Sequence, residues 1–93
     1  MSRTRIGAIL ESANSVDILL YVHDRPLCLK SEIYRNVSRN AHTRELMDIL
    51  HSEGLLSMEP IGRGNAHVLE LTDKGLEVAD LLLRLEETLR RRS

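Results

Sequence analysis

The chain has 93 residues, enough for one compact domain, and 42% of them are hydrophobic, which excludes a disordered chain. The net charge of −1 weighs against nucleic acid as a partner, because proteins that bind DNA usually carry a basic excess. A single cysteine excludes an internal disulfide. Since no apolar run approaches the roughly 20 residues that cross a bilayer, we expect a cytoplasmic protein with no membrane association.

Aliphatic residues must form the core, because the sequence has no Phe, no Trp and only two Tyr, and this favours packed helices. The first clear helix begins at Asn14-Ser15, which offer capping side chains, and Asp17 complements the helix dipole. It ends at Asp24-Arg25-Pro26, because the residue before a proline is driven out of the helical region. Residues 5–11 are compatible with a short separate helix that packs on a partner.

Two further short helices follow, separated by a polar turn. After an extended piece at 27–29, residues 30–37 form a brief second helix. Residues 38–40 are a turn rich in capping side chains. Residues 41–53 form the third helix, whose apolar residues are spaced for one face: Leu46, Met47 and Leu50. Gly54 is placed as its left-handed C-terminal cap.

The pattern then changes from helical to extended. Residues 55–61 and 66–71 flank Gly62-Arg63-Gly64-Asn65, whose glycines permit the positive φ of a hairpin turn. Thr72-Asp73 caps a last, leucine-rich helix that runs towards Arg90. The predicted fold class is therefore mostly α with a small β-hairpin (α+β). We expect a single domain over residues 1–93, with a core at 14–71 and a C-terminal helix at 72–92.

The order helix, short strand, helix, turn, helix, hairpin, long helix is that of a winged helix-turn-helix. Lys30-Ser31-Glu32-Ile33, the LHSEGLL run at 50–56 and the LTDKG run at 71–75 resemble motifs of MarR- and ArsR-type transcriptional regulators and small archaeal winged-helix dimers. The resemblance covers roughly residues 14 to 89. It implies a homodimeric, DNA-binding transcriptional regulator, and we expect a repressor. Its third helix would enter the major groove, and its hairpin wing would reach the minor groove or the backbone.

The start of the third helix and the wing carry the expected contacts to double-stranded DNA. Arg44 can bond guanine bidentately and Asn40 can bond adenine, while Ser38, Arg39 and Thr43 suit phosphates. Arg63, between two glycines, can enter an A·T-rich minor groove. The full expected set is Lys30, Ser38, Arg39, Asn40, Ala41, His42, Thr43, Arg44, Arg63 and Asn65.

Simpler interpretations stand beside these. Arg44 can pair with Asp48 at the i,i+4 spacing, and the wing turn can be plain surface. Glu45 and Asp48 share the outward face with Arg44 and repel phosphates. These acids and the near-neutral charge favour two alternatives: a winged-helix protein-interaction module without DNA binding, and a non-specific architectural DNA-binding protein.

The last helix carries two apolar stripes, with Leu76, Ala79 and Leu83 on one side and Val78, Leu82, Leu85 and Leu89 on another. A helix that rests on one domain needs only one stripe, so the second predicts a homodimer. The alternative is that both stripes pack within a monomer. The expected dimer contacts are Ile6, Ile9, Leu10, Val78, Leu82, Leu85 and Leu89.

No catalytic, cofactor or metal site is expected. The four histidines lie on separate elements, and the Cys and His positions lack zinc-ligand spacing. Cys28, between two leucines, is expected to be an inert buried thiol. The sequence therefore predicts no enzyme, and it identifies no small-molecule effector.

Overall fold

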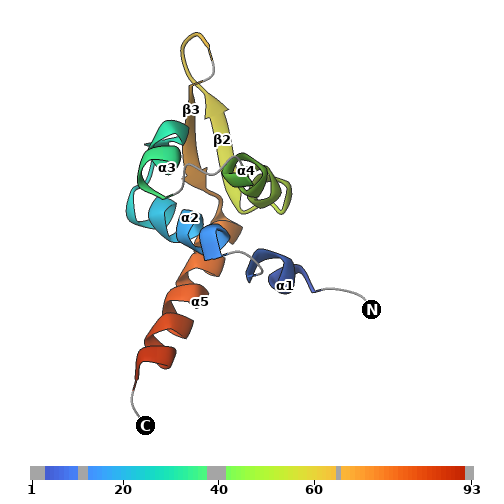
Figure 1. Cartoon of the computed structure of the whole chain (residues 1–93), viewed down its shortest axis with the longest axis vertical. Helices are drawn as coiled ribbons and strands as arrows, with labels where there is room; N and C mark the ends of the chain where they lie inside the picture. Colours follow the sequence, from blue (N-terminus) through green and yellow to red (C-terminus); the bar gives the residue numbers. More distant parts are fainter. Residues whose placement is uncertain (1–3, 11–12, 38–41, 65, 92–93) are drawn as a thin grey trace.

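The computed structural model describes residues 4–10, 13–37, 42–64 and 66–91, and the statements below concern these residues. Five helices and three short strands follow one another in the described part of the chain (Figure 1). The elements are α1 (Arg5–Leu10), α2 (Ala13–Asp24), β1 (Cys28–Leu29), α3 (Lys30–Asn36), α4 (His42–Ser52), β2 (Leu56–Pro60), β3 (His67–Leu71) and α5 (Asp73–Arg90). None of the described helices is both long enough and apolar enough to span a membrane.

The strands form one antiparallel sheet in the order β1-β3-β2. Leu69 in the middle of β3 pairs with Met58 of β2 on one side and with Cys28 of β1 on the other. The predicted hairpin is therefore confirmed, and the short extended piece before α3 adds a third strand to it. The loop between β2 and β3 projects from one end of the molecule, away from α5 (Figure 1).

The core lies between the sheet and the helices α2, α3 and α4. Its fully buried apolar members are aliphatic or methionine, as the composition predicts, and include Ile18, Leu19, Ile33, Met47, Leu50, Leu55, Leu56 and Leu69. The predicted inner face of α4 is confirmed, since Leu46, Met47 and Leu50 are at most 5% exposed. The predicted capping position of α2 is wrong: α2 begins at Ala13, so Asn14 and Ser15 lie within its first turn rather than before it. Other boundaries differ from expectation by a residue.

The C-terminal end of α4 is joined closely to the start of α5. Gly54 has a φ of 78°, and its N–H and that of Leu55 donate to carbonyls of the last turn of α4, which confirms the predicted cap. Thr72 caps α5 by accepting a hydrogen bond from the N–H of Gly75 at 3.0 Å. Gly75 lies against the backbone of Leu55, and a Cβ built on it would lie only 2.0 Å from the Leu55 oxygen. The glycine therefore permits the approach of the two segments.

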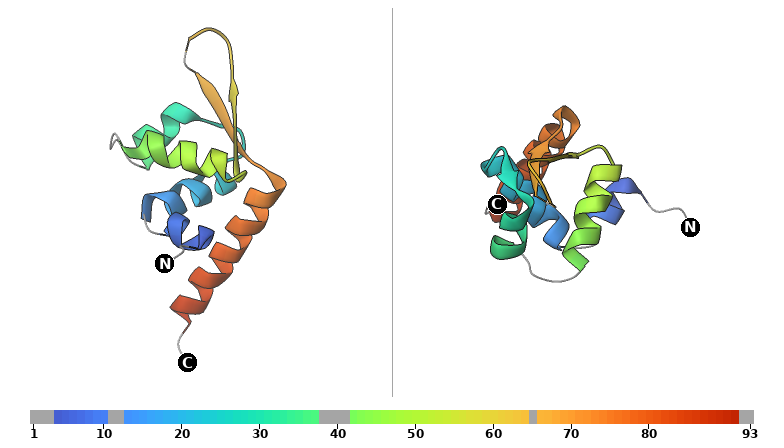
Figure 2. Two further views of the ribbon diagram at one scale, coloured as in Figure 1. Left: turned by 90° about the vertical axis from the view of Figure 1, so that its right-hand side faces the viewer. Right: turned by 90° about the horizontal axis from the view of Figure 1, so that it is seen from above.

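The N-terminal half of α5 packs on α2, and the C-terminal half of α5 extends away from the body of the molecule (Figure 2). Its inner face corrects one prediction. Leu82 was expected to face a partner, but it is 8% exposed and belongs to the core of its own chain, as Ala79 does. Gly75, Ala79 and Leu82 follow the i, i+4, i+7 spacing of one helix face, which explains the shared burial.

Candidate nucleic-acid interface

Helix α4 presents a polar outer face. Arg44, Glu45 and Asp48 are exposed, as helical spacing predicts. Thr43, in contrast, was expected at the phosphates, but its side chain is fully buried. The physical reason is its spacing, because Thr43 precedes the buried Leu46 and Met47 by three and four residues and so shares their face. The Thr43 side chain is therefore withdrawn from the expected set of DNA contacts.

A groove of about 610 Å³ lies between the start of α3, the outer face of α4 and the wing. It brings together three cations that the sequence analysis placed on separate elements: Lys30, Arg44 and Arg63. The complete lining is Leu29, Lys30, Ser31, Tyr34, Arg44, Arg63, Ala66 and His67. Because no carboxylate is among these residues, the lining of the groove carries a net positive charge although the chain as a whole has a net charge of −1.

The cations of this groove are available to a ligand. Within the described part of the chain, Arg44 forms no ion pair with Asp48, so the intrahelical pairing is not adopted. His42, another expected contact, lies 2.8 Å from Glu45 between Nδ1 and Oε2, in an i,i+3 pair. When His42 is protonated, this pair offsets an acid that would otherwise repel phosphates from the start of α4.

The start of α3 is held by Glu32, and this fixes Lys30 and Ser31 at the edge of the groove. The Glu32 carboxylate accepts hydrogen bonds from the Leu29 N–H at 2.8 Å and from the Tyr21 hydroxyl at 3.1 Å. The Leu29 N–H is the main cause of a lowered Glu32 pKa, and the Tyr21 hydroxyl and two nearby arginines lower it further. The ionised Glu32 carboxylate therefore caps the N-terminus of α3.

The wing places Arg63 at an exposed position between two glycines. Gly62 and Gly64 have φ values of 60° and 90°, which explains why this turn needs glycine on both sides. The remaining expected DNA contacts lie outside the described residues: Ser38, Arg39, Asn40, Ala41 and Asn65.

Sequence reasoning missed three polar residues that line the groove, namely Ser31, Tyr34 and His67. A signal existed for Tyr34, because it follows Lys30 by four residues and Ser31 by three and so shares their side of α3. No local signal existed for His67. Its place in the groove depends on how the wing is oriented relative to α3.

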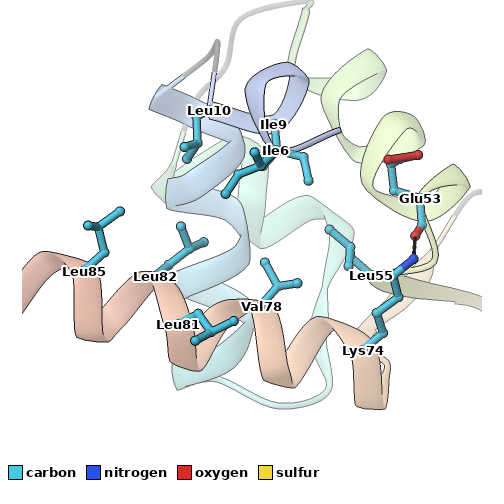
Figure 3. A pocket seen from close by; sticks show the side chains of 10 residues that line it. All are labelled: Ile6, Ile9, Leu10, Glu53, Leu55, Lys74, Val78, Leu81, Leu82 and Leu85. Atoms are coloured by element: carbon cyan, nitrogen blue, oxygen red, sulfur yellow. Dashed lines mark hydrogen bonds between the residues drawn. The ribbon is translucent and has the colours of Figure 1, made fainter. Parts of the chain in front are cut away.

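A second, apolar groove of about 410 Å³ lies between α1, α5 and the end of α4 (Figure 3). It gathers six of the seven residues that were expected at a dimer contact: Ile6, Ile9, Leu10, Val78, Leu82 and Leu85. Ile9, like Leu82, is only 8% exposed and belongs to the core of its own chain, so its expected place at the partner is corrected in the same way. The seventh, Leu89, lies further along α5 and is 74% exposed. Leu81, which was not expected, also lines the groove and is 61% exposed. In the described part of the chain, no group of three or more His, Cys, Asp or Glu residues is arranged to hold a metal ion.

Comparison with known proteins identifies the fold. No family model and no curated protein matches the sequence. Among solved structures, MarR is similar with a TM-score of 0.75 and 24% identity over 90% of this chain, which spans 61% of the length of MarR. A protein from Archaeoglobus fulgidus has a TM-score of 0.75 and 15% identity, over 96% of this chain and all of that one. A transcriptional regulator homologue from Pyrococcus horikoshii has a TM-score of 0.67 and 18% identity, over 91% of this chain and 92% of that one. The predicted MarR-like winged helix-turn-helix fold is therefore confirmed.

Proposed function

We propose that the chain is a homodimeric transcriptional regulator that binds duplex DNA, with α4 in the major groove and the wing at the minor groove or backbone. One observation carries the proposal: Lys30, Arg44 and Arg63, from three separate elements, line one groove that has no carboxylate in its lining. The phosphates of a duplex are regularly spaced negative charges, so a duplex is a ligand that can meet three such cations at once.

The dimensions of α4 suit this role. Its 11 residues form a rod about 16 Å long, and the major groove is about 12 Å wide. Arg44, on the outer face, has the fork geometry that bonds the O6 and N7 of guanine. Lys30 and Arg63, at the edges of the groove, are placed for phosphates or for the minor groove. In this role the chain catalyses no reaction, and it represses transcription by occupying the operator.

The dimer is proposed from the leucines of α5. Leu81, Leu85 and Leu89 are 61%, 46% and 74% exposed, and Leu81 and Leu85 border the apolar groove beside α1. A second copy that packs its own α1 and α5 here would remove these side chains from water, at about 25 cal/mol for each Å² of apolar surface. Such a dimer holds two α4 helices together, and it suits half-sites about one helical turn apart.

The DNA-binding proposal is tested by selecting bound duplexes from a random pool, followed by gel-shift titrations at several salt concentrations. We expect Arg44→Ala to cost about 1–3 kcal/mol and to relax preference at one base pair. Lys30→Ala and Arg63→Ala should weaken binding to all duplex sequences alike and reduce the salt dependence of the binding constant. Arg84→Ala is the matched control, because Arg84 is an exposed arginine of α5 outside this groove.

Two outcomes would contradict the proposal. An intact dimer with no duplex affinity at low salt would support a protein-interaction module in its place. Equal affinity for selected and random duplexes would support a non-specific architectural role.

The dimer is tested by sedimentation of variants at matched concentrations. Leu85→Glu should dissociate it, because a carboxylate would then be buried among leucines. Leu76→Glu is the control, because Leu76 is 43% exposed on the same helix but does not line the groove. If both variants sediment like the wild type, the α5 interface is wrong.

A further inference from the structure

We propose that Lys74 is a positioning residue that clamps the C-terminal end of α4 to the start of α5 and so fixes the spacing of the two α4 helices in the dimer. The inference rests on the proposed function for its consequence, the preferred distance between half-sites. The clamp itself is a property of one chain, and it can be tested without DNA.

Two hydrogen bonds join the first turn of α5 and its cap residue Thr72 to the segment that directly follows α4. The Lys74 Nζ donates to the Glu53 carbonyl oxygen at 3.0 Å (Figure 3), and the Thr72 Oγ1 donates to the Gly54 carbonyl oxygen at 2.5 Å. Carbonyls at a helix C-terminus lack partners within the helix, and the negative end of the dipole attracts a cation there. The ammonium group of Lys74 therefore meets both requirements of the end of α4.

The rest of the junction acts as a pivot that does not need Lys74. Thr72 also receives the Gly75 N–H, and its own N–H donates to the Leu55 oxygen at 3.1 Å. Gly75 lies directly against that same oxygen.

Short backbone contacts at one point keep two helices together but leave their angle to other restraints. The packing of Ala79 and Leu82 in the core restrains α5 relative to α2, and Lys74 adds a direct restraint relative to the end of α4. Among the hydrogen bonds described here between α5 and the end of α4, the one made by the Lys74 side chain starts farthest along α5. The His23 Nε2 lies 3.1 Å from the Asp80 Oδ1 still farther along α5, but this pair joins α5 to α2.

A small change of angle matters because α5 is long. Its 18 residues form a rod about 27 Å long, so a rotation of about 5° at the junction moves its far end by about 2 Å. Half-sites on DNA are separated in steps of about 3.4 Å along the duplex axis. A loose junction therefore lets the two α4 helices accept neighbouring spacings that a fixed junction excludes.

Lys74 is also placed to sense what fills the apolar groove. Lys74, Glu53 and Leu55 line that groove together with the leucines of α5. A second copy seated in the groove would shield the hydrogen bond from Lys74 to the Glu53 carbonyl from water, and a hydrogen bond strengthens when the local dielectric falls. Dimer formation and a fixed angle of α4 are thus expected to support each other.

The first measurement is made on the full chain without DNA. Spin labels on Asp48→Cys of α4 and Glu87→Cys of α5, in a Cys28→Ala background, report the distance between the helices when labelled chains are diluted into unlabelled ones. Lys74→Met keeps the apolar stem and removes the donors, Lys74→Arg restores a donor, and Arg84→Met is the matched loss of charge. We expect Lys74→Met to broaden the distance distribution by at least about 2 Å, and the other two variants to match the wild type.

The second measurement uses duplexes in which two selected half-sites are separated by one base pair more or fewer. One net hydrogen bond changes an equilibrium constant by about two- to tenfold, so we expect Lys74→Met to reduce the wild-type discrimination between spacings by about threefold or more. Affinity for an isolated half-site should change by less than about twofold.

The outcomes separate the clamp from the proposed function. An unchanged distance distribution in Lys74→Met overturns the clamp. If Lys74→Met weakens binding equally to every duplex, isolated half-sites included, the clamp is also overturned, because Lys74 would then be merely structural. A wild-type chain without duplex affinity refutes the proposed function, while a broadened distribution in Lys74→Met would still establish the clamp.

Discussion

The junction between α4 and α5 makes a sharp prediction for Gly75→Ala. A Cβ at this position would lie 2.0 Å from the Leu55 oxygen and 2.9 Å from its carbonyl carbon. Ordinary contacts begin near 3.4 Å, so the start of α5 would have to retreat by more than about 1 Å. The obstructing atoms belong to the backbone and have no alternative rotamer. The retreat would also stretch the hydrogen bond from the Thr72 N–H to the same oxygen, which is 3.1 Å long.

The expected loss follows from two opposing terms. Overpacking of a filled interior costs about 1–3 kcal/mol and occasionally more, and a backbone clash belongs at the upper end. Alanine is favoured over glycine within a helix by up to about 1 kcal/mol, which offsets part of this cost. We therefore expect Gly75→Ala to lower the free energy of unfolding by about 2 kcal/mol, a large share of the stability of a small domain.

Urea unfolding monitored by circular dichroism, at equal and constant protein concentration, measures this loss. Gly7→Ala is the matched control, because Gly7 is also helical and, among the described residues, its added Cβ would meet the Thr4 Oγ1 alone, at 3.0 Å. A hydroxyl can move, so the control should change stability by less than about 1 kcal/mol. If Gly75→Ala unfolds at the wild-type urea concentration, the close approach of α5 to Leu55 is not a constraint on the fold.

Three further predictions concern single side chains. The pKa of Glu32 is lowered in the folded chain, so its ionised carboxylate contributes stability at neutral pH, and this contribution is lost as the pH falls through the pKa of the folded state. Glu32→Gln should therefore lower the urea midpoint at pH 7. It should also make the urea midpoint fall less between pH 7 and about pH 3. Burial raises the pKa of Cys28, which is 4% exposed, so a thiolate-specific disulfide reagent should label it only as fast as the chain opens. The buried Thr43 hydroxyl has no hydrogen-bond partner among the described residues, so Thr43→Val should retain or raise stability by up to about 1 kcal/mol and leave duplex affinity unchanged.

Features that depend on neighbours in sequence were predictable. The inner face of α4 follows from the spacing of Leu46, Met47 and Leu50, and the cap at Gly54 follows from the end of that spacing. The hairpin follows from glycines on both sides of Arg63. In each case the residues that determine the feature lie close together in the sequence, so no knowledge of the tertiary structure was needed.

Features that depend on the angle between elements were not predictable. Periodicity shows that α5 has two apolar sides, but it does not say which is turned towards α2. The close packing of Gly75 on Leu55 sets that rotation, buries Leu82 and leaves Leu81 exposed. His67 enters the cationic groove for a similar reason, because the groove exists only once β3 and α3 are placed side by side. The same packing produced both the error at Leu82 and the omission of Leu81.

The net charge of −1 argued against DNA, and the arrangement of the charges explains why that argument is weak. Five acids lie along α5: Asp73, Glu77, Asp80, Glu86 and Glu87. The wing and α5 project in opposite directions, so the C-terminal end of α5 lies far from the wing (Figure 1). Exposed charges further apart than about 10 Å are largely screened at 0.1 M salt. A duplex at the groove would therefore meet Lys30, Arg44 and Arg63 in the lining and Glu45 and Asp48 on the neighbouring face of α4, whereas the acids at the far end of α5 would contribute little.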